Sequence, residues 1–118
     1  MIWYYLINLF LFILLALDGW TNPNGHSIYN FMIIADHKEY LYSLRDLSNI
    51  NHTTKNLEEE IDRIITEIGP KKFAAVVTDN ASAISNARKH ISEKYPHILN
   101  IRCIAHFVNL ITKDILGK

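Results

Sequence analysis

The sequence predicts a single α/β domain in which three strands come first and helices then alternate with strands. Two observations support this prediction. Apolar runs of strand length lead to an acidic residue twice, at Asp18 and at Asp79, and a stretch with helical periodicity separates the two runs. A helix between two strands allows them to lie parallel through a right-handed crossover. Both acids would then reach the same edge of one mixed sheet.

Length and composition fit one folded domain. The chain has 118 residues, of which 49% are hydrophobic, and this is enough to fill a core. Its 12 basic and 12 acidic residues cancel, so nucleic-acid binding would have to use a local basic patch. The single cysteine, Cys103, excludes an internal disulfide and fits a reducing compartment.

The uncharged N-terminal run, residues 1–17, has two interpretations. As a membrane span it has about the minimum length, and as a signal peptide it lacks a basic n-region. Either of these would give a membrane-tethered or secreted protein. The other interpretation makes residues 1–9 an apolar extension and residues 10–118 the folded domain, which would begin with a buried strand ending at Asp18.

Two further strands follow the first and are expected to form a hairpin. The turn-forming cluster Thr-Asn-Pro-Asn-Gly at residues 21–25 predicts that the chain reverses after the first strand. Residues 26–35 and 39–47 are rich in β-branched and aromatic side chains. These three strands should therefore be antiparallel neighbours.

The remaining elements alternate helix with strand. Apolar side chains repeat with helical period over residues 54–68, and Gly69 with Pro70 supplies the stop. The later elements are a strand over 73–78, a helix closed by Pro96, a strand over 99–103 and a third helix over 104–115. The predicted order is βββαβαβα.

Four short blocks occur in a fixed order along the chain. They are Asp18-Gly-Trp-Thr, Val77-Thr-Asp-Asn-Ala81, Tyr95-Pro-His-Ile and Cys103-Ile-Ala-His106-Phe-Val-Asn-Leu110. Together they resemble hAT-type transposases, in particular the domain of unknown function found beside BED zinc fingers in their domesticated relatives. The resemblance covers about residues 11–115. It implies a ribonuclease-H-like fold, as in retroviral-integrase and transposase catalytic domains, here incomplete at the C-terminus.

The resemblance also implies a metal-dependent nuclease and strand-transferase core. Asp18 and Asp79 match the family's first two catalytic acids, and Mg²⁺ or Mn²⁺ would be the cofactor. The residue chemistry agrees, since these ions take oxygen ligands from one or two carboxylates, waters and substrate phosphate. No residue aligns with the family's third acid, a downstream Glu, so a fragment inactive by itself is expected and enzymatic activity stays open. Glu58 to Glu60, at the start of the first predicted helix, offer a substitute.

Each acid also has a purely structural interpretation. Asp18 can be a turn residue before Gly19, and Asp79 can cap the second helix. Trp20 can stack on a base or, as large aromatic residues more often do, pack over the edge of the sheet.

Residues around the acids are expected to support the site or to contact nucleic acid. Cys103 and His106 share a helical face, yet zinc needs three or four ligands and no second pair has suitable spacing. His106 is instead expected near the acids, where it can touch a phosphate. The densest basic stretch comprises Lys71, Lys72, Arg88, Lys89, Lys94 and Arg102. Those side chains either meet the DNA backbone or form an ordinary solvated surface.

The resemblance implies a nuclear protein that is a fragment of a transposase or a domesticated derivative. Its partners would be DNA at transposon ends, and a second copy or another transposase-derived protein. Two alternatives remain open. The chain can be a non-catalytic protein-interaction module whose sheet edge a partner covers, or a small protein tethered to a membrane by residues 1–17.

Overall fold

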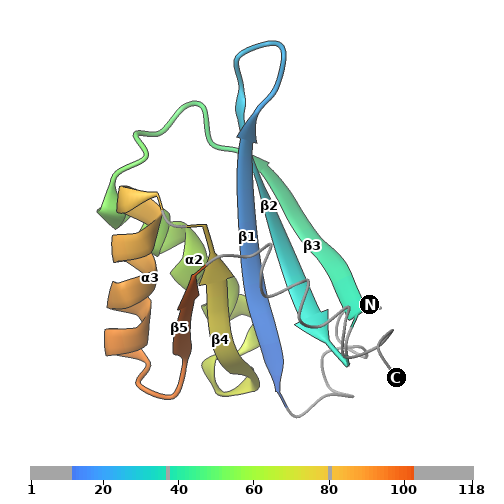
Figure 1. Ribbon diagram of the computed structural model, residues 1–118, viewed down its shortest axis with the longest axis vertical. Helices are drawn as coiled ribbons and strands as arrows, with labels where there is room; N and C mark the ends of the chain where they lie inside the picture. The colour runs from blue at the N-terminus through green and yellow to red at the C-terminus, as the bar shows by residue number, and fades with distance from the viewer. Residues whose placement is uncertain (1–11, 37, 80, 103–118) are drawn as a thin grey trace.

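The computed structural model of the protein describes residues 12–36, 38–79 and 81–102. The elements are β1 (Ile13–Thr21), β2 (Ser27–Ala35), β3 (Lys38–Asp46), α2 (Thr54–Ile68), the short 3-10 helix η1 (Pro70–Lys72), β4 (Phe73–Thr78), α3 (Ser82–Lys94) and β5 (Leu99–Arg102). Figure 1 shows their arrangement. The third helix expected over residues 104–115 lies outside the described residues, as do Cys103 and His106.

The five strands form one mixed sheet in the order β3-β2-β1-β4-β5. β1 and β2 are antiparallel, as are β2 and β3, whereas β4 runs parallel to both β1 and β5. The prediction of an α/β domain with a mixed sheet and a parallel crossover from the first strand to the fourth is therefore confirmed.

Helix α2 begins and ends where the sequence predicts. The Thr53 side chain accepts a hydrogen bond from the Asn56 backbone N–H at the N-terminus, and Gly69 has φ 122° at the C-terminus, a conformation that favours glycine. Its buried face consists of Leu57, Ile61, Ile64 and Ile65. The first turn of α2 contains no acidic residue, because Glu58 to Glu60 begin one turn into the helix.

The main core lies between one face of the sheet and the two helices. In Figure 1, α2 and α3 both lie on this side of the sheet. Phe31, Phe73 and Ile61 are each 0% exposed, and side chains from β1, β2, β4, α2 and α3 join them in one cluster. Burial of this apolar area supplies most of the driving force for folding, at roughly 25 cal/mol per Å². The helices thus hold β1 and β4 in place from one side.

The opposite face of the sheet carries a smaller cluster. Ala16, Ile34 and Val77 are buried there, and Leu14, Met32 and Ile101 pack around them. Among the described residues, no helical side chain belongs to this cluster. We refer to this side, opposite α2 and α3, as the second face.

The end of the first strand differs from the prediction. Asp18 was expected to end it, but the ladder between β1 and β2 continues to the pair Thr21 and Ser27. The chain reverses only after this pair, where the Asn22 Oδ1 accepts from the Asn24 and His26 backbone N–H groups. Asp18 therefore lies inside a strand and is not a turn residue.

The apolar N-terminal run extends into the middle of the sheet. Its residues from Ile13 onward belong to β1, which has strand neighbours on both sides. Among the helices in the described ranges, none has the length and apolarity to span a membrane.

Candidate functional site

The two predicted acids lie at the same level of adjacent parallel strands. The last paired residues of β1 and β4 are Ala16 and Val77, and Asp18 and Asp79 each follow by two positions. Continuing this register by two residues sets the backbone of Asp18 beside that of Asp79, at the usual separation between strands of about 4.8 Å. Both acids are exposed. They therefore come from separate parts of the chain to one edge of the sheet.

Asp79 is held at this edge by its own backbone surroundings. Its Oδ1 accepts a hydrogen bond from the Ala81 backbone N–H at 3.1 Å. The N-cap position of α3 is Ala81, not Asp79, and it forms no side-chain capping bond. Asp79 thus orders the turn between β4 and α3 without being the N-cap, and this bond engages one of its two carboxylate oxygens.

Asn30 adds a third oxygen next to the acids. It lies directly opposite Asp18 in the antiparallel ladder between β1 and β2. Its Oδ1 is buried and has no hydrogen-bond partner among the residues that the structure describes. A buried acceptor without a partner costs about 1 to 3 kcal/mol, so such an atom needs an explanation. Sequence reasoning missed Asn30, although an asparagine within an apolar strand was a visible signal.

Arg88 fixes the end of β4. Its side chain is 3% exposed. Its Nη1 donates to the main-chain carbonyl of Thr78 at 3.2 Å and to that of Asp79 at 2.9 Å. Further hydrogen bonds from the guanidinium reach the Thr78 Oγ1 and the Asn100 Oδ1, so one side chain joins α3, β4 and β5.

Burial lowers the pKa of Arg88, the positive charge of Arg102 lowers it further, and the negative charge of Asp79 raises it. A guanidinium stays protonated under such shifts because its usual pKa lies above 12. Arg88 was expected among the basic surface residues. The structure instead buries it directly behind Asp79.

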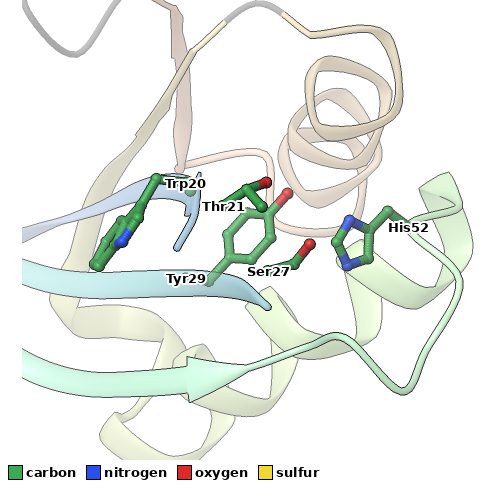
Figure 2. Close-up of a pocket in the computed structure, with 6 residues that line it drawn as sticks. Trp20, Thr21, Ser27, Tyr29 and His52 are labelled. Carbon is green, nitrogen blue, oxygen red and sulfur yellow. The ribbon is translucent and has the colours of Figure 1, made fainter. Parts of the chain in front are cut away.

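A shallow pocket of about 160 Å³ opens beside this edge, where β1 and β2 approach their turn. It is lined by Gly19, Trp20, Thr21, Ser27, Tyr29 and His52, most of which Figure 2 labels. The Tyr29 and His52 rings meet edge to face with centroids 5.6 Å apart. Burial raises the pKa of Tyr29, and the negative charge of Asp79 raises it further. The charge of Asp79 therefore acts on a side chain that lines the pocket.

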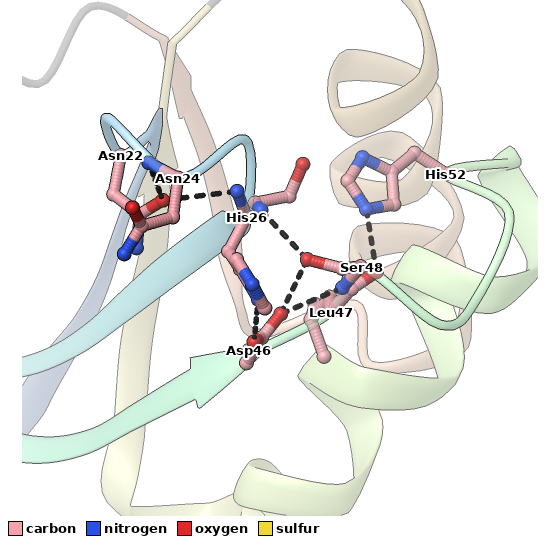
Figure 3. Close-up of polar contacts among 8 residues, drawn as sticks. Asn22, Asn24, His26, Asp46, Leu47, Ser48 and His52 are labelled. Carbon is pink, nitrogen blue, oxygen red and sulfur yellow. Dashed lines mark hydrogen bonds and ion pairs between the residues drawn. The ribbon is translucent and has the colours of Figure 1, made fainter.

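A network of polar contacts ties the ends of β2 and β3 together below this pocket (Figure 3). The Asp46 Oδ1 accepts from the Ser48 backbone N–H and from the Ser48 hydroxyl, and its Oδ2 lies 2.6 Å from the His26 Nδ1. The Ser48 hydroxyl oxygen also accepts from the Ser27 backbone N–H. These bonds lower the pKa of Asp46 to about 2. The side chains of His26, Asp46 and Ser48 thus hold the start of β2 against the residues that follow β3.

Three of the predicted basic residues, Lys71, Lys72 and Arg102, lie at opposite ends of the sheet. Arg102 pairs with Thr78 in the register of β4 and β5, at the same edge as Asp79. Lys71 and Lys72 lie in η1, which precedes the first residue of β4, and so belong to the opposite end. Trp20 is 45% exposed on β1, more open than the packing interpretation predicted.

The donor set fits a hard cation such as Mg²⁺ or Mn²⁺. Asp18, Asn30 and Asp79 offer oxygen atoms from three neighbouring strands, and oxygen is the ligand these ions prefer. Within residues 12–36, 38–79 and 81–102, no group of three or more His, Cys, Asp or Glu side chains forms a metal site. A cation there would thus depend on two carboxylates and the neutral amide oxygen.

A family model matches residues 12–117 of the chain, described as "Domain of unknown function (DUF659)". A curated relative is the "Putative transcriptional regulator tpeD" of Talaromyces stipitatus, 27% identical over an alignment that covers 88% of this chain. The chain spans 14% of the length of that relative.

Two solved structures share the fold at low sequence identity. One is T. thermophilus RuvC in complex with a Holliday junction substrate, with a TM-score of 0.50, 10% identity, and coverage of 90% of this chain and 79% of RuvC. The other is a chain of the simian T-cell lymphotropic virus intasome in complex with PP2A regulatory subunit B56 gamma. Its TM-score is 0.51 with 12% identity, and the match covers 90% of this chain and 37% of that chain. The predicted ribonuclease-H-like fold is confirmed.

Proposed function

Because the chain belongs to the family of the DUF659 domain, we propose that it is the metal-binding core of a hAT-like transposase or of a domesticated derivative. The observation that carries this proposal is the position of Asp18 and Asp79 at one level of neighbouring parallel strands. The fold shared with RuvC and with the viral intasome chain supports DNA as the partner. Membership of a transposase-like family supports the nucleus as the site of action.

In this proposal Asp18 and Asp79 hold Mg²⁺ or Mn²⁺, which when bound activates an attacking oxygen and stabilises the leaving oxygen of a phosphodiester. Arg102, at the same edge, offers a positive charge to the DNA backbone. Arg88 donates to the consecutive carbonyls of Thr78 and Asp79 and so holds the Asp79 backbone at the end of β4. The third acid of the family has no match in this sequence, so the roles that we assign to these residues are metal binding and DNA binding.

Titration with Mn²⁺ tests the metal site directly. We expect paramagnetic broadening of the backbone amide NMR signals of Asp18, Asp79 and their neighbours at millimolar or lower metal. Asp18→Asn removes one of two charged ligands and should weaken the apparent affinity by about tenfold or more.

Asp36→Asn is the matched control. Asp36 follows the last residue of β2, at the end of the sheet away from Asp18, and its φ of 52° is a conformation that asparagine adopts readily. This variant should bind Mn²⁺ like the unaltered protein. An absence of broadening at Asp18 and Asp79, or equal broadening in Asp18→Asn, contradicts the proposal.

A second candidate function is a non-catalytic protein-interaction module. Leu41 and Leu44 on the edge strand β3 are 53% and 54% exposed, which favours contact with a partner. The same titration separates the two functions, because an interaction module requires no response to Mn²⁺ at the acids.

A further inference from the structure

The buried oxygen of Asn30 is the least explained polar atom next to the acidic edge. The Asn30 Oδ1 is shielded from solvent and accepts no hydrogen bond from any described residue, although the large majority of buried acceptors have a partner. Leaving it without one destabilises the fold. The position must therefore offer something that compensates for this cost, and an acceptor oxygen without a partner is suited to a cation.

The position of Asn30 is fixed by the strand ladder. Asn30 and Asp18 face each other across β1 and β2, and directly opposed side chains in an antiparallel pair have their Cβ atoms about 4.5 to 5.5 Å apart. Asp18 is two positions from Ala16 on β1, and Asn30 is two positions from Met32 on β2. Ala16 and Met32 belong to the second face, and residues two apart in a strand point to the same side. The side chains of Asn30 and Asp18 therefore leave the sheet on the same side.

Charge explains why an amide suits this position. Two carboxylates, Asp18 and Asp79, already neutralise a divalent cation. A third carboxylate at the buried position would add a negative charge that is costly to remove from water. An amide oxygen supplies a ligand of the kind that Mg²⁺ and Mn²⁺ accept without that charge.

We propose that the Asn30 side-chain oxygen is a third protein ligand of a divalent cation bound by Asp18 and Asp79. The proposal rests on the metal site proposed above and extends it to β2. It also differs from the expectation that a third ligand has to be an acid. The cation would then join three adjacent strands, β2, β1 and β4.

The test follows the Asn30 side-chain NH₂ signals by NMR during titration with Mg²⁺ and then with Mn²⁺. We expect the Asn30 pair to shift with Mg²⁺ and to broaden with Mn²⁺ at the same concentrations as the Asp18 and Asp79 backbone amides. The NH₂ pair of Asn86, an exposed residue of α3, is the internal control and should remain unchanged.

The variant Asn30→Leu distinguishes a role of Asn30 as a metal ligand from a purely structural role. It removes the oxygen without a partner, so the metal-free variant should be more resistant to urea than the unaltered chain, while its Mn²⁺ affinity falls about tenfold or more. Asn30→Asp should bind Mn²⁺ more tightly and be less stable without metal. Asn86→Leu should change neither property.

The outcomes distinguish a failure of the role proposed for Asn30 from a failure of the metal site formed by Asp18 and Asp79. Mn²⁺ broadening at Asp18 and Asp79 with unchanged affinity in Asn30→Leu overturns the role of Asn30 and leaves the two-acid site intact. No broadening at either acid overturns both. If Asn30→Leu fails to fold, the Mn²⁺ affinity of Asn30→Ala, which removes the same oxygen, decides the question.

Discussion

At the residue scale, Arg88 shows how one side chain can hold a functional edge together. Its guanidinium donates to the carbonyls of Thr78 and Asp79 and to the amide oxygen of Asn100; the contact with Thr78 is buried and the other two are partly buried. Composition and spacing could only assign Arg88 to a basic stretch. One of its hydrogen-bond partners is an asparagine twelve residues further along the chain, and a linear pattern does not reveal such a contact.

Replacing Arg88 should therefore cost stability. Arg88→Met leaves several buried acceptors without donors, and we expect a loss on the order of 3 kcal/mol in the free energy of unfolding. Lys89→Met, at the exposed neighbouring position, should change it by less than about 0.5 kcal/mol. Urea denaturation followed by circular dichroism measures both. Equal losses in the two variants would show that the contacts of Arg88 contribute little.

Asp46 predicts a specific dependence of stability on pH. Its pKa in the folded protein is about 2, lowered first by hydrogen bonds from Ser48 and then by His26, against about 3.9 in an unfolded chain. A lowered pKa contributes stability that is complete above about pH 4 and is lost as the pH falls toward 2. Asp46→Asn should be less stable than the unaltered chain at pH 5, and the difference should disappear near pH 2. Urea midpoints measured at intervals of one pH unit test this, and a difference that stays constant with pH would refute it.

At the element scale, local signals predicted helices better than strand ends. The bounds of α2 follow from Thr53 and Gly69, which act within one turn of the helix. The end of β1 depends on β2, because the pairs that follow Asp18 form only when residues from Ser27 to Tyr29 lie alongside. The acid after the apolar run therefore marked the end of β4, at Asp79, but not that of β1, at Asp18.

Gly19 illustrates the same dependence of β1 on its neighbour. A Cβ atom added there would lie 2.8 Å from the Tyr29 Cε1, closer than packed atoms allow. Gly19→Ala should displace the Tyr29 ring from His52 and destabilise the fold by about 1 to 3 kcal/mol.

Tyr29→Leu provides the matched partner for a double-mutant cycle. If the ring is the obstacle, Gly19→Ala should be much less destabilising in the Tyr29→Leu background than in the unaltered chain. Urea denaturation of the four proteins gives the coupling between the positions. Additive losses would mean that the alanine disturbs the strand for another reason.

At the scale of the whole molecule, the element order and the crossover were predictable because periodicity and turn residues define each segment. The assembly of the site was predictable only in part. Parallel pairing of β1 with β4 brings Asp18 and Asp79 to one edge, as two matching apolar runs suggested. The inclusion of Asn30 and the placement of Lys71 and Lys72 at the other end depend on register and chain direction, which emerge only from the complete sheet.

The central position of β1 has a consequence for synthesis on the ribosome. A nascent chain that has emerged as far as Asp46 contains β1, β2 and β3, but not β4, which occupies the other side of β1 in the finished sheet. Until β4 is translated, the backbone of β1 presents an open edge on which a strand from another polypeptide can pair. Closing that edge requires contact between distant segments and is slow. Protection of the growing chain by a chaperone is thus most valuable between the translation of β3 and that of β4.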